Sequence, residues 1–253
     1  MCIRDRAKTE GINGNFDCVT YLDISTDPEE DGAEVYTDVK TAKEALGATS
    51  PHAAALWPMG AVGDKVYYLS AMFAALTAYT DANNADVPYE SPSNKDLRIT
   101  ATVLKDGTTV ALDQQQANDV LNANGVITAI NANGFKSWGN NTAAYPSTTD
   151  PKDRWWAVRR FFDWDGNNFI QTYFQKVDKP GNKRLIQSIV DSQNIIGNGY
   201  VARDYCAGYR VEFRSDENPV TNLLAGHLTV HTYLAPYIPC LLYTSPSPRD
   251  LST

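Results

Sequence analysis

The stretch Trp155-Trp156-Ala157-Val158-Arg159-Arg160-Phe161-Phe162-Asp163-Trp164 surrounds two adjacent arginines with more aromatic surface than any other window of the sequence. We interpret its first part as an aromatic strand, in which Arg159 and Arg160 point to opposite faces. In an acidic chain, adjacent arginines of this kind are expected to pair with carboxylates across a contact between subunits. The side chains of Trp155 and Trp156 are expected in the core or in that contact.

Two helical patterns and two alternating strands follow. The most regular helix opens at Asn182, and we expect Gly197 and Gly199 to end it. The other elements, recognised by the spacing of their apolar residues, are a helix over 169–177 and strands over 209–213 and 226–234.

Upstream of the central stretch, strands and helices alternate without a regular βαβ order, which indicates an α+β fold with mixed sheets and packed helices. Asp64 is expected to cap a helix that reaches Tyr79, and the segment 81–94, rich in proline and asparagine, is the best candidate for a linker. The segment 131–141 is expected to be a loop. The remaining expected elements are strands over 16–24, 53–57, 97–103 and 126–130 and helices over 37–46 and 113–124.

Composition and charge narrow the classes of protein. The 253 residues are 43% hydrophobic and 11% aromatic, enough for a sizeable core. The formal net charge of -8 disfavours nucleic acid or an anionic membrane as a partner. The longest apolar runs fall well short of the roughly 20 residues that cross a bilayer as a helix.

Both ends of the sequence resemble translated sequencing adapter. Residues 1–6 and residues 240–253 match the two reading directions of a common transposase adapter end. We therefore expect both segments to be artefacts and the natural reading frame to be truncated on both sides. Cys18 and Cys206 then remain, and two isolated cysteines suggest a reducing compartment rather than a disulfide framework.

Five short motifs occur in a fixed order along the chain. They are Tyr89-Glu90-Ser91-Pro92-Ser93-Asn94, Leu121-Asn122 with Gly125-Val126-Ile127, Trp138-Gly139-Asn140-Asn141-Thr142, Val158-Arg159-Arg160, and Asn218 followed by Gly226. None is specific alone. Together, in this order, they resemble the C-terminal domain of contractile phage tail sheath proteins.

The resemblance implies a domain division and a structural role. Residues 7–90 would be part of a middle or outer sheath domain, the remnant of an α/β insertion domain, and residues 91–239 a truncated C-terminal domain. Sheath subunits stack as helical rings around a tail tube and contract without nucleotide, and their arms add strands to a neighbour's sheet. The candidate subunit interface comprises Arg159, Arg160, Trp155, Trp156 and Asn218.

The implied partners are other sheath subunits, the tail tube protein, and baseplate and tail terminator proteins, with no nucleic acid, membrane or cofactor. The implied location is the virion tail, assembled in the cytoplasm of the host bacterium. Contractile bacteriocins and injection machines use similar sheaths, so the same fold also fits a prophage-like locus.

Three possible sites have simpler explanations: a calcium loop near Gly166, a metal site at His227 and His231, and a nucleophile at Cys206. An EF-hand calcium loop needs glycine at its sixth position. With Gly166 in that place, the first ligand position falls on Phe161, which cannot bind calcium. We therefore expect a capped helix start at 163–168. His227 and His231 on one strand would stand roughly 13 Å apart, too far to share a metal. His52 is expected to be structural, and Cys206 a small buried residue.

A soluble α+β enzyme with its site in the loops 131–165 is the alternative from a different class. A concave pocket with convergent ionisable groups would favour it. The sequence has no Gly-rich phosphate loop ending in Gly-Lys-Ser/Thr.

Overall fold

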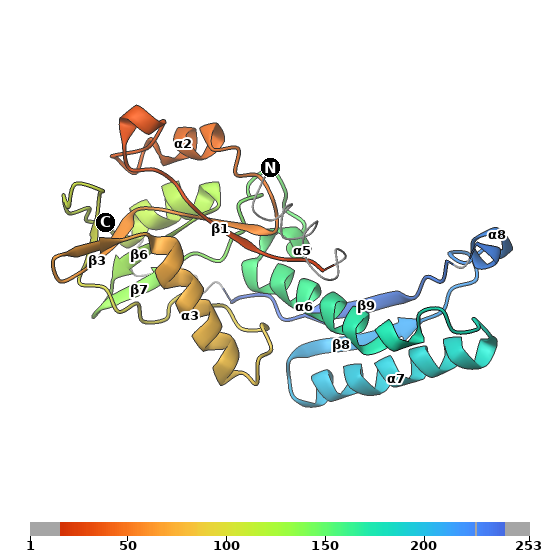
Figure 1. Ribbon diagram of the computed structural model, residues 1–253. Helices are drawn as coiled ribbons and strands as arrows, with labels where there is room; N and C mark the ends of the chain where they lie inside the picture. The colour runs from red at the N-terminus through yellow and green to blue at the C-terminus, as the bar shows by residue number, and fades with distance from the viewer. Residues whose placement is uncertain (1–15, 226, 241–253) are drawn as a thin grey trace, which may run out of the picture.

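The computed structural model describes residues 16–225 and 227–240 (Figure 1); residues 1–6 and 241–253 of the expected adapter segments lie outside them. The strands are β1 (Thr20–Asp23), β2 (Ala53–Leu56), β3 (Met59–Val62), β4 (Lys65–Tyr67), β5 (Ala101–Val103), β6 (Val126–Asn131), β7 (Phe135–Trp138), β8 (Cys206–Glu212) and β9 (His231–Pro236). The helices are α2 (Val39–Ala45), α3 (Leu69–Asn83), α4 (Gln114–Gln116), α5 (Pro151–Arg154), α6 (Trp156–Tyr173), α7 (Lys183–Ala202) and α8 (Val220–Leu224), with the short turns η1 (Pro28–Glu30), η2 (Ala117–Leu121), η3 (Asn122–Asn124) and η4 (Phe174–Lys176).

A mixed four-stranded sheet forms the centre, in the order β1-β2-β6-β7, with β1, β2 and β6 parallel and β7 antiparallel. Every residue of β2 is buried. Ala53, Ala55 and Trp57 face one apolar cluster, while Ala54 and Leu56 face a second. A strand covered on both faces is apolar throughout rather than alternating. This arrangement confirms the predicted strand at 53–57 and the α+β fold.

A second sheet, in the order β4-β3-β5, corrects the helix expected from Asp64. The chain instead turns at Gly63, whose φ of +59° suits glycine, so that β4 pairs antiparallel with β3. The helix α3 begins only at Leu69. Its buried stripe includes Phe73 and Thr77, while Tyr79, expected on the inner face, is 67% exposed.

The segment 131–141 is also a strand hairpin rather than a loop. β7 pairs antiparallel with β6 around Asn133 and Gly134, both at positive φ. Asn-Gly between two apolar runs is the strongest short-range indication of a tight hairpin, because both central residues tolerate the left-handed conformation.

The central sheet runs across the expected domain boundary at residue 90, because β1 and β2 precede it and β6 and β7 follow it. The segment 81–94 is likewise packed rather than free. Val87 is buried, and the ring of Tyr89 stacks on that of Tyr205 with 4.8 Å between centroids. The two-part division stays a prediction, and this segment joins elements that pack together rather than separate cores.

The stretch 155–164 is a helix, not a strand. Trp155 is the extended residue before α6, and Ala157, Phe161 and Trp164 then recur at helical spacing. Asp163 therefore lies inside the helix rather than at its start. α6 extends from the central sheet to a separate layer made of α7 and the β8–β9 hairpin, with α8 at its far end (Figure 1).

The α7 layer was predicted in part. Asn182 caps α7 by accepting a hydrogen bond from the backbone N–H of Leu185, as expected. The helix continues past Gly197 and Gly199 to Ala202. Strand β8 lies where one was predicted, whereas β9 begins at His231 instead of 226.

Candidate functional site

The guanidinium of Arg159 joins two carboxylates near the start of α6. Its Nη1 lies 3.0 Å from Oδ1 of Asp153 in α5, and its Nε and Nη2 lie 2.9 and 2.5 Å from Oδ1 of Asp163, one turn along α6. The Arg159 side chain is 12% exposed and that of Asp163 only 5%. A buried carboxylate needs such a partner, because an isolated charge is costly to bury.

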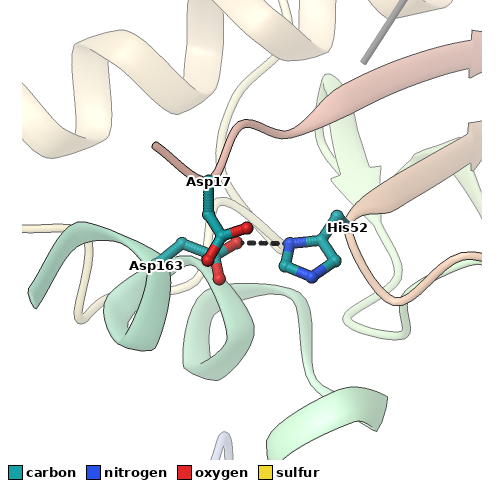
Figure 2. Close-up of side chains that lie close together, drawn as sticks. All are labelled: Asp17, His52 and Asp163. Atoms are coloured by element: carbon teal, nitrogen blue, oxygen red, sulfur yellow. Dashed lines mark hydrogen bonds and ion pairs between the residues drawn. The ribbon is translucent and has the colours of Figure 1, made fainter. Parts of the chain in front are cut away.

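The second oxygen of Asp163 accepts a hydrogen bond from a residue that precedes β2. His52 Nδ1 lies 2.8 Å from Asp163 Oδ2, and the carboxylate of Asp17 points toward the same place (Figure 2). Asn167, one turn after Asp163, holds the Asp17 backbone through two hydrogen bonds of 2.9 and 2.8 Å. These contacts fix β1 and β2 to α6.

Asp17, His52 and Asp163 are ligand types for a metal ion, and one ligand atom from each lies within 4.8 Å of the others. Two ligand atoms on one zinc ion stand roughly 3.4 Å apart, given Zn–N and Zn–O distances of about 2.0–2.2 Å and tetrahedral angles. The 2.8 Å separation of His52 and Asp163 is that of a direct hydrogen bond. Arg159 already neutralises Asp163. We therefore assign the three residues to a polar cluster in which His52 and Asp163 are buried and hydrogen-bonded to each other and Asp17 is partly buried.

Arg160 pairs with Asp81 near the end of α3, 79 positions earlier in the sequence. Both nitrogens at the end of its guanidinium donate to the two oxygens of Asp81. The pair connects α3 to α6, and its side chains are 11% and 19% exposed. The carboxylates expected across a subunit contact thus lie within the same chain for Arg159 and Arg160.

The other candidate residues also have intrachain partners. Trp156 is fully buried against Tyr21, with ring centroids 5.5 Å apart, and Trp155 is 7% exposed beneath Arg154. Asn218 lies far from them, where its side chain closes the connection between β8 and β9. It accepts from Thr229 N and donates to Thr229 O and to the carbonyl of residue 214. A subunit contact at these residues stays a prediction.

A polar network between α6, α7 and β8 was missed by the sequence analysis. The hydroxyl of Tyr209 donates to Asp165, 3.0 and 3.1 Å from its two oxygens, and accepts from Gln193 Nε2 at 2.7 Å. Burial raises the pKa of Asp165 to about 6. The available indication was spacing: Gln193 lies between Ile189 and Gly197 on the buried face of α7.

Two surface hollows bear on the enzyme alternative. One is lined by residues of α7 together with Phe213, and the other by residues around Asp27 and Lys105. Neither is lined by any residue of the segment 131–165, where the alternative placed its site.

Among residues 16–225 and 227–240, no helix has the length and apolarity to cross a bilayer.

No protein-family profile matches the chain. Two curated proteins named tail sheath protein align with it. That of Burkholderia phage BcepMu is 29% identical over 187 residues, which cover 73% of this chain and 37% of the relative. That of Escherichia phage P2 is 30% identical over 126 residues, which cover 48% of this chain and 30% of the relative. The chain thus spans about a third of the length of the curated relatives it matches.

Solved structures share the fold. A chain in the cryo-EM structure of the anti-feeding prophage baseplate aligns with a TM-score of 0.71 at 16% identity, over 97% of this chain and 64% of that one. A chain of the PVC extracellular contractile injection system, in its contracted sheath complex, aligns with a TM-score of 0.70 at 19% identity, over 91% and 64%. The predicted resemblance is confirmed: the chain resembles tail sheath proteins in sequence and chains of contractile machines in fold.

Proposed function

We propose that this chain is a structural subunit of a contractile tail sheath. In this role it polymerises helically around a tail tube and contracts to drive the tube through a target envelope, without nucleotide hydrolysis. The observation that carries the proposal is the alignment with the BcepMu tail sheath protein over 187 residues. The shared fold supports it.

The buried polar contacts between distant elements fit a subunit that moves as a near-rigid body. A contracting lattice repacks its subunits against one another, so each subunit must keep its own shape. Arg160 with Asp81 ties α6 to α3, and Asp163 with His52 ties α6 to the start of β2. Removing one partner of the Arg160–Asp81 pair should cost about 3 kcal/mol or more, because it leaves the other charge largely buried and uncompensated. Both contacts therefore disfavour separate movement of the elements they join.

The β8–β9 hairpin fits strand exchange between subunits. Within the described part of the chain, this sheet has two strands only. Asn194 of α7 hydrogen-bonds both the N–H and the carbonyl of Val211 at the outer edge of β8, so the outer edge of β9 is the one open to a further strand. An isolated two-stranded sheet is marginally stable, and packing of α7 on β8 offsets part of that weakness. A strand donated by a neighbour would complete the sheet through main-chain hydrogen bonds. An uncovered edge would instead favour aggregation.

The proposed role sets the partners and the location. Copies of the same subunit surround a tail tube protein and end at baseplate and tail terminator proteins. The particle is a virion tail or a related injection machine, assembled in the bacterial cytoplasm. The driving free energy resides in a metastable extended lattice.

Assembly tests the proposal. The gene that encodes this chain is expressed, and its product is viewed by negative-stain electron microscopy, alone and with the neighbouring tube gene product. Long hollow cylinders of sheath width are expected. A protein that stays monomeric in the presence of the tube protein would overturn the proposal.

A further inference from the structure

Carboxylates gather at one corner of the molecule, around η1 and the turn after β5. From Asp27 to Glu34, five of the eight residues are acidic and none is basic, and Asp106 adds a sixth carboxylate. The acidic corner is defined by Asp27, Glu29, Glu30, Asp31, Glu34 and Asp106. Lys105 neutralises part of this negative charge, because its Nζ lies 3.2 Å from Asp27 and 3.5 Å from Glu30.

The acidic corner is hollowed. An open pocket of about 250 Å³ lies between η1 and the turn after β5, and it is lined by the acidic residues Asp27, Glu34 and Asp106 together with Lys105. That volume is roughly eight times the ~30 Å³ share of one water molecule, enough for the five heavy atoms of a lysine side chain. A cation entering this pocket meets three carboxylates against the single ammonium group of Lys105, which already pairs with Asp27.

Cations gather around the turn between η4 and α7. Residues 176–184 contain four basic side chains and one acidic, in a chain whose net charge is -8. The basic end is defined by Lys176, Lys179, Lys183 and Arg184. Within residues 16–225 and 227–240, these side chains form no ion pair, and Lys179, Lys183 and Arg184 are exposed.

Two of these cations stand where they disfavour their own helix. Lys183 and Arg184 occupy the first turn of α7, the positive end of the helix dipole. A cation there destabilises a helix by a few tenths of a kcal/mol, and at most about 1 kcal/mol. Both also line an open groove of about 740 Å³, with Ile186 and Phe213 as its apolar wall. Lys183 and Arg184 therefore do not serve the stability of their own helix. Their position beside the groove is consistent with binding an anionic surface of another molecule.

The acidic corner and the basic end lie at opposite ends of the molecule. η1 and α2 stand beyond the central sheet at one end, while the start of α7 stands at the far end of the β8–β9 layer (Figure 1). One copy therefore cannot bring its own two ends together. A contact between them joins two copies head to tail, and such a contact generates a filament when it does not close into a ring.

We propose that the basic end of one copy docks on the acidic corner of a second copy. The inference deepens the proposed function, since it names a contact by which the subunits assemble, and it rests on that function. Charge complementarity favours a second copy as the partner, because the basic end carries excess positive charge and the acidic corner carries excess negative charge. Exposed charges are screened by salt, so the contact weakens as ionic strength rises.

Two variants isolate the contact. The acid-neutral variant carries Glu29→Gln, Glu34→Gln and Asp106→Asn and keeps the basic end; Asp27 and Glu30 stay, because Lys105 already pairs with them. The base-neutral variant carries Lys179→Gln, Lys183→Gln and Arg184→Gln and keeps the acidic corner. Sedimentation velocity at 25 mM and 500 mM NaCl compares each variant alone, their equimolar mixture and the unmodified chain. A control variant with Asp64→Asn, Asp119→Asn and Asp204→Asn changes the net charge as the acid-neutral variant does, at exposed sites elsewhere.

The expected result is self-association of the unmodified chain and of the control variant in low salt. Each neutralised variant alone stays monomeric, and their mixture forms a heterodimer whose dissociation constant rises at least tenfold in 500 mM NaCl. Self-association of the base-neutral variant, or loss of association in the control, would overturn the contact. So would binding of the basic end to the tube protein without any heterodimer.

The two proposals fail in distinguishable ways. Hollow cylinders in the assembly experiment, together with a mixture of the two variants that stays monomeric, would support the sheath function and overturn the contact. A heterodimer without cylinders would support the contact and overturn the sheath function. Monomers in both experiments would overturn both.

Discussion

Gly197 of α7 lies against the ring of Tyr209 in β8, so closely that a Cβ at position 197 would overlap the ring atoms. This close approach brings the Tyr209 hydroxyl to Asp165 on α6 and to Gln193 on α7. One missing methyl group thus allows three elements to share one hydrogen-bond network. It also explains why a glycine stands inside a helix, where it costs about 1 kcal/mol relative to alanine.

Replacing Gly197 by alanine should lower the free energy of unfolding by about 2–3 kcal/mol, because overpacking displaces the Tyr209 ring. The measurement is urea unfolding followed by circular dichroism. Gly199→Ala is the matched control: it lies in the same helix, and an added Cβ meets no atom within 4 Å. It should stabilise by up to about 1 kcal/mol through helix propensity. Equal losses for both variants would show that the Tyr209 contact is not the cause.

Asp165 should make stability fall as pH rises. Burial raises its folded-state pKa to about 6 from an ordinary value of 3.8, so the folded chain holds this proton more tightly than the unfolded chain. The stabilisation is complete below about pH 4 and is lost as pH rises to about 6, a difference of about 3 kcal/mol at most.

Asp165→Asn removes the charge and keeps an acceptor for Tyr209. We expect it to raise the melting temperature at pH 8 and to leave it nearly unchanged at pH 4, in thermal scans across that range. Asp119→Asn, an exposed substitution, should show no such pH dependence. A destabilised Asp165→Asn protein at pH 8 would contradict the assignment.

The pair of Arg160 and Asp81 should behave as a buried clamp. Arg160→Met or Asp81→Asn alone should cost about 3 kcal/mol, since each leaves a largely buried partner charge uncompensated. The double variant should cost clearly less than the sum, as a double-mutant cycle by urea unfolding would show. Lys95→Met, which breaks the more exposed pair with Glu90, should cost less than about 1 kcal/mol. Additive effects at Arg160 and Asp81 would rule out the clamp.

The sequence predicts local features well and long-range ones poorly. The apolar run at 53–57 and the Asn182 cap are set by neighbouring residues, and both were predicted correctly. The prediction of a strand at 155–164 is wrong because tryptophan and phenylalanine commonly favour strands. In the structure this stretch begins helix α6, in which Trp156 packs in one apolar cluster and Phe161 in another. The Asn133-Gly134 pair is typical of a hairpin turn. The polar composition of the segment 131–141 instead favoured a loop, which is why the hairpin was not predicted.

The candidate site shows the same limit. Arg159 and Arg160 stood out in the sequence, yet the partners of this region come from distant positions. Asp81 lies 79 residues from Arg160, and His52 lies 111 residues from Asp163. Nothing in the spacing of the chain encodes such pairs. Charge alone predicts inter-subunit partners for the two arginines, whereas the fold supplies intrachain carboxylates for both. A subunit contact at these residues stays a prediction.

The cluster of Asp17, His52 and Asp163 should not respond to zinc. If it bound zinc, an ion at 100 times its dissociation constant would add about 2.7 kcal/mol of stability. For a chain of this size, that corresponds to a rise of roughly 5–10 °C in melting temperature. We expect a shift below about 1 °C, with zinc or with chelator, in differential scanning fluorimetry. His52→Asn should lower stability by about 1–2 kcal/mol in both conditions, because the hydrogen bond to Asp163 is weakened. A zinc-dependent rise that His52→Asn abolishes would instead establish a metal site, and Arg159 would then have to release Asp163.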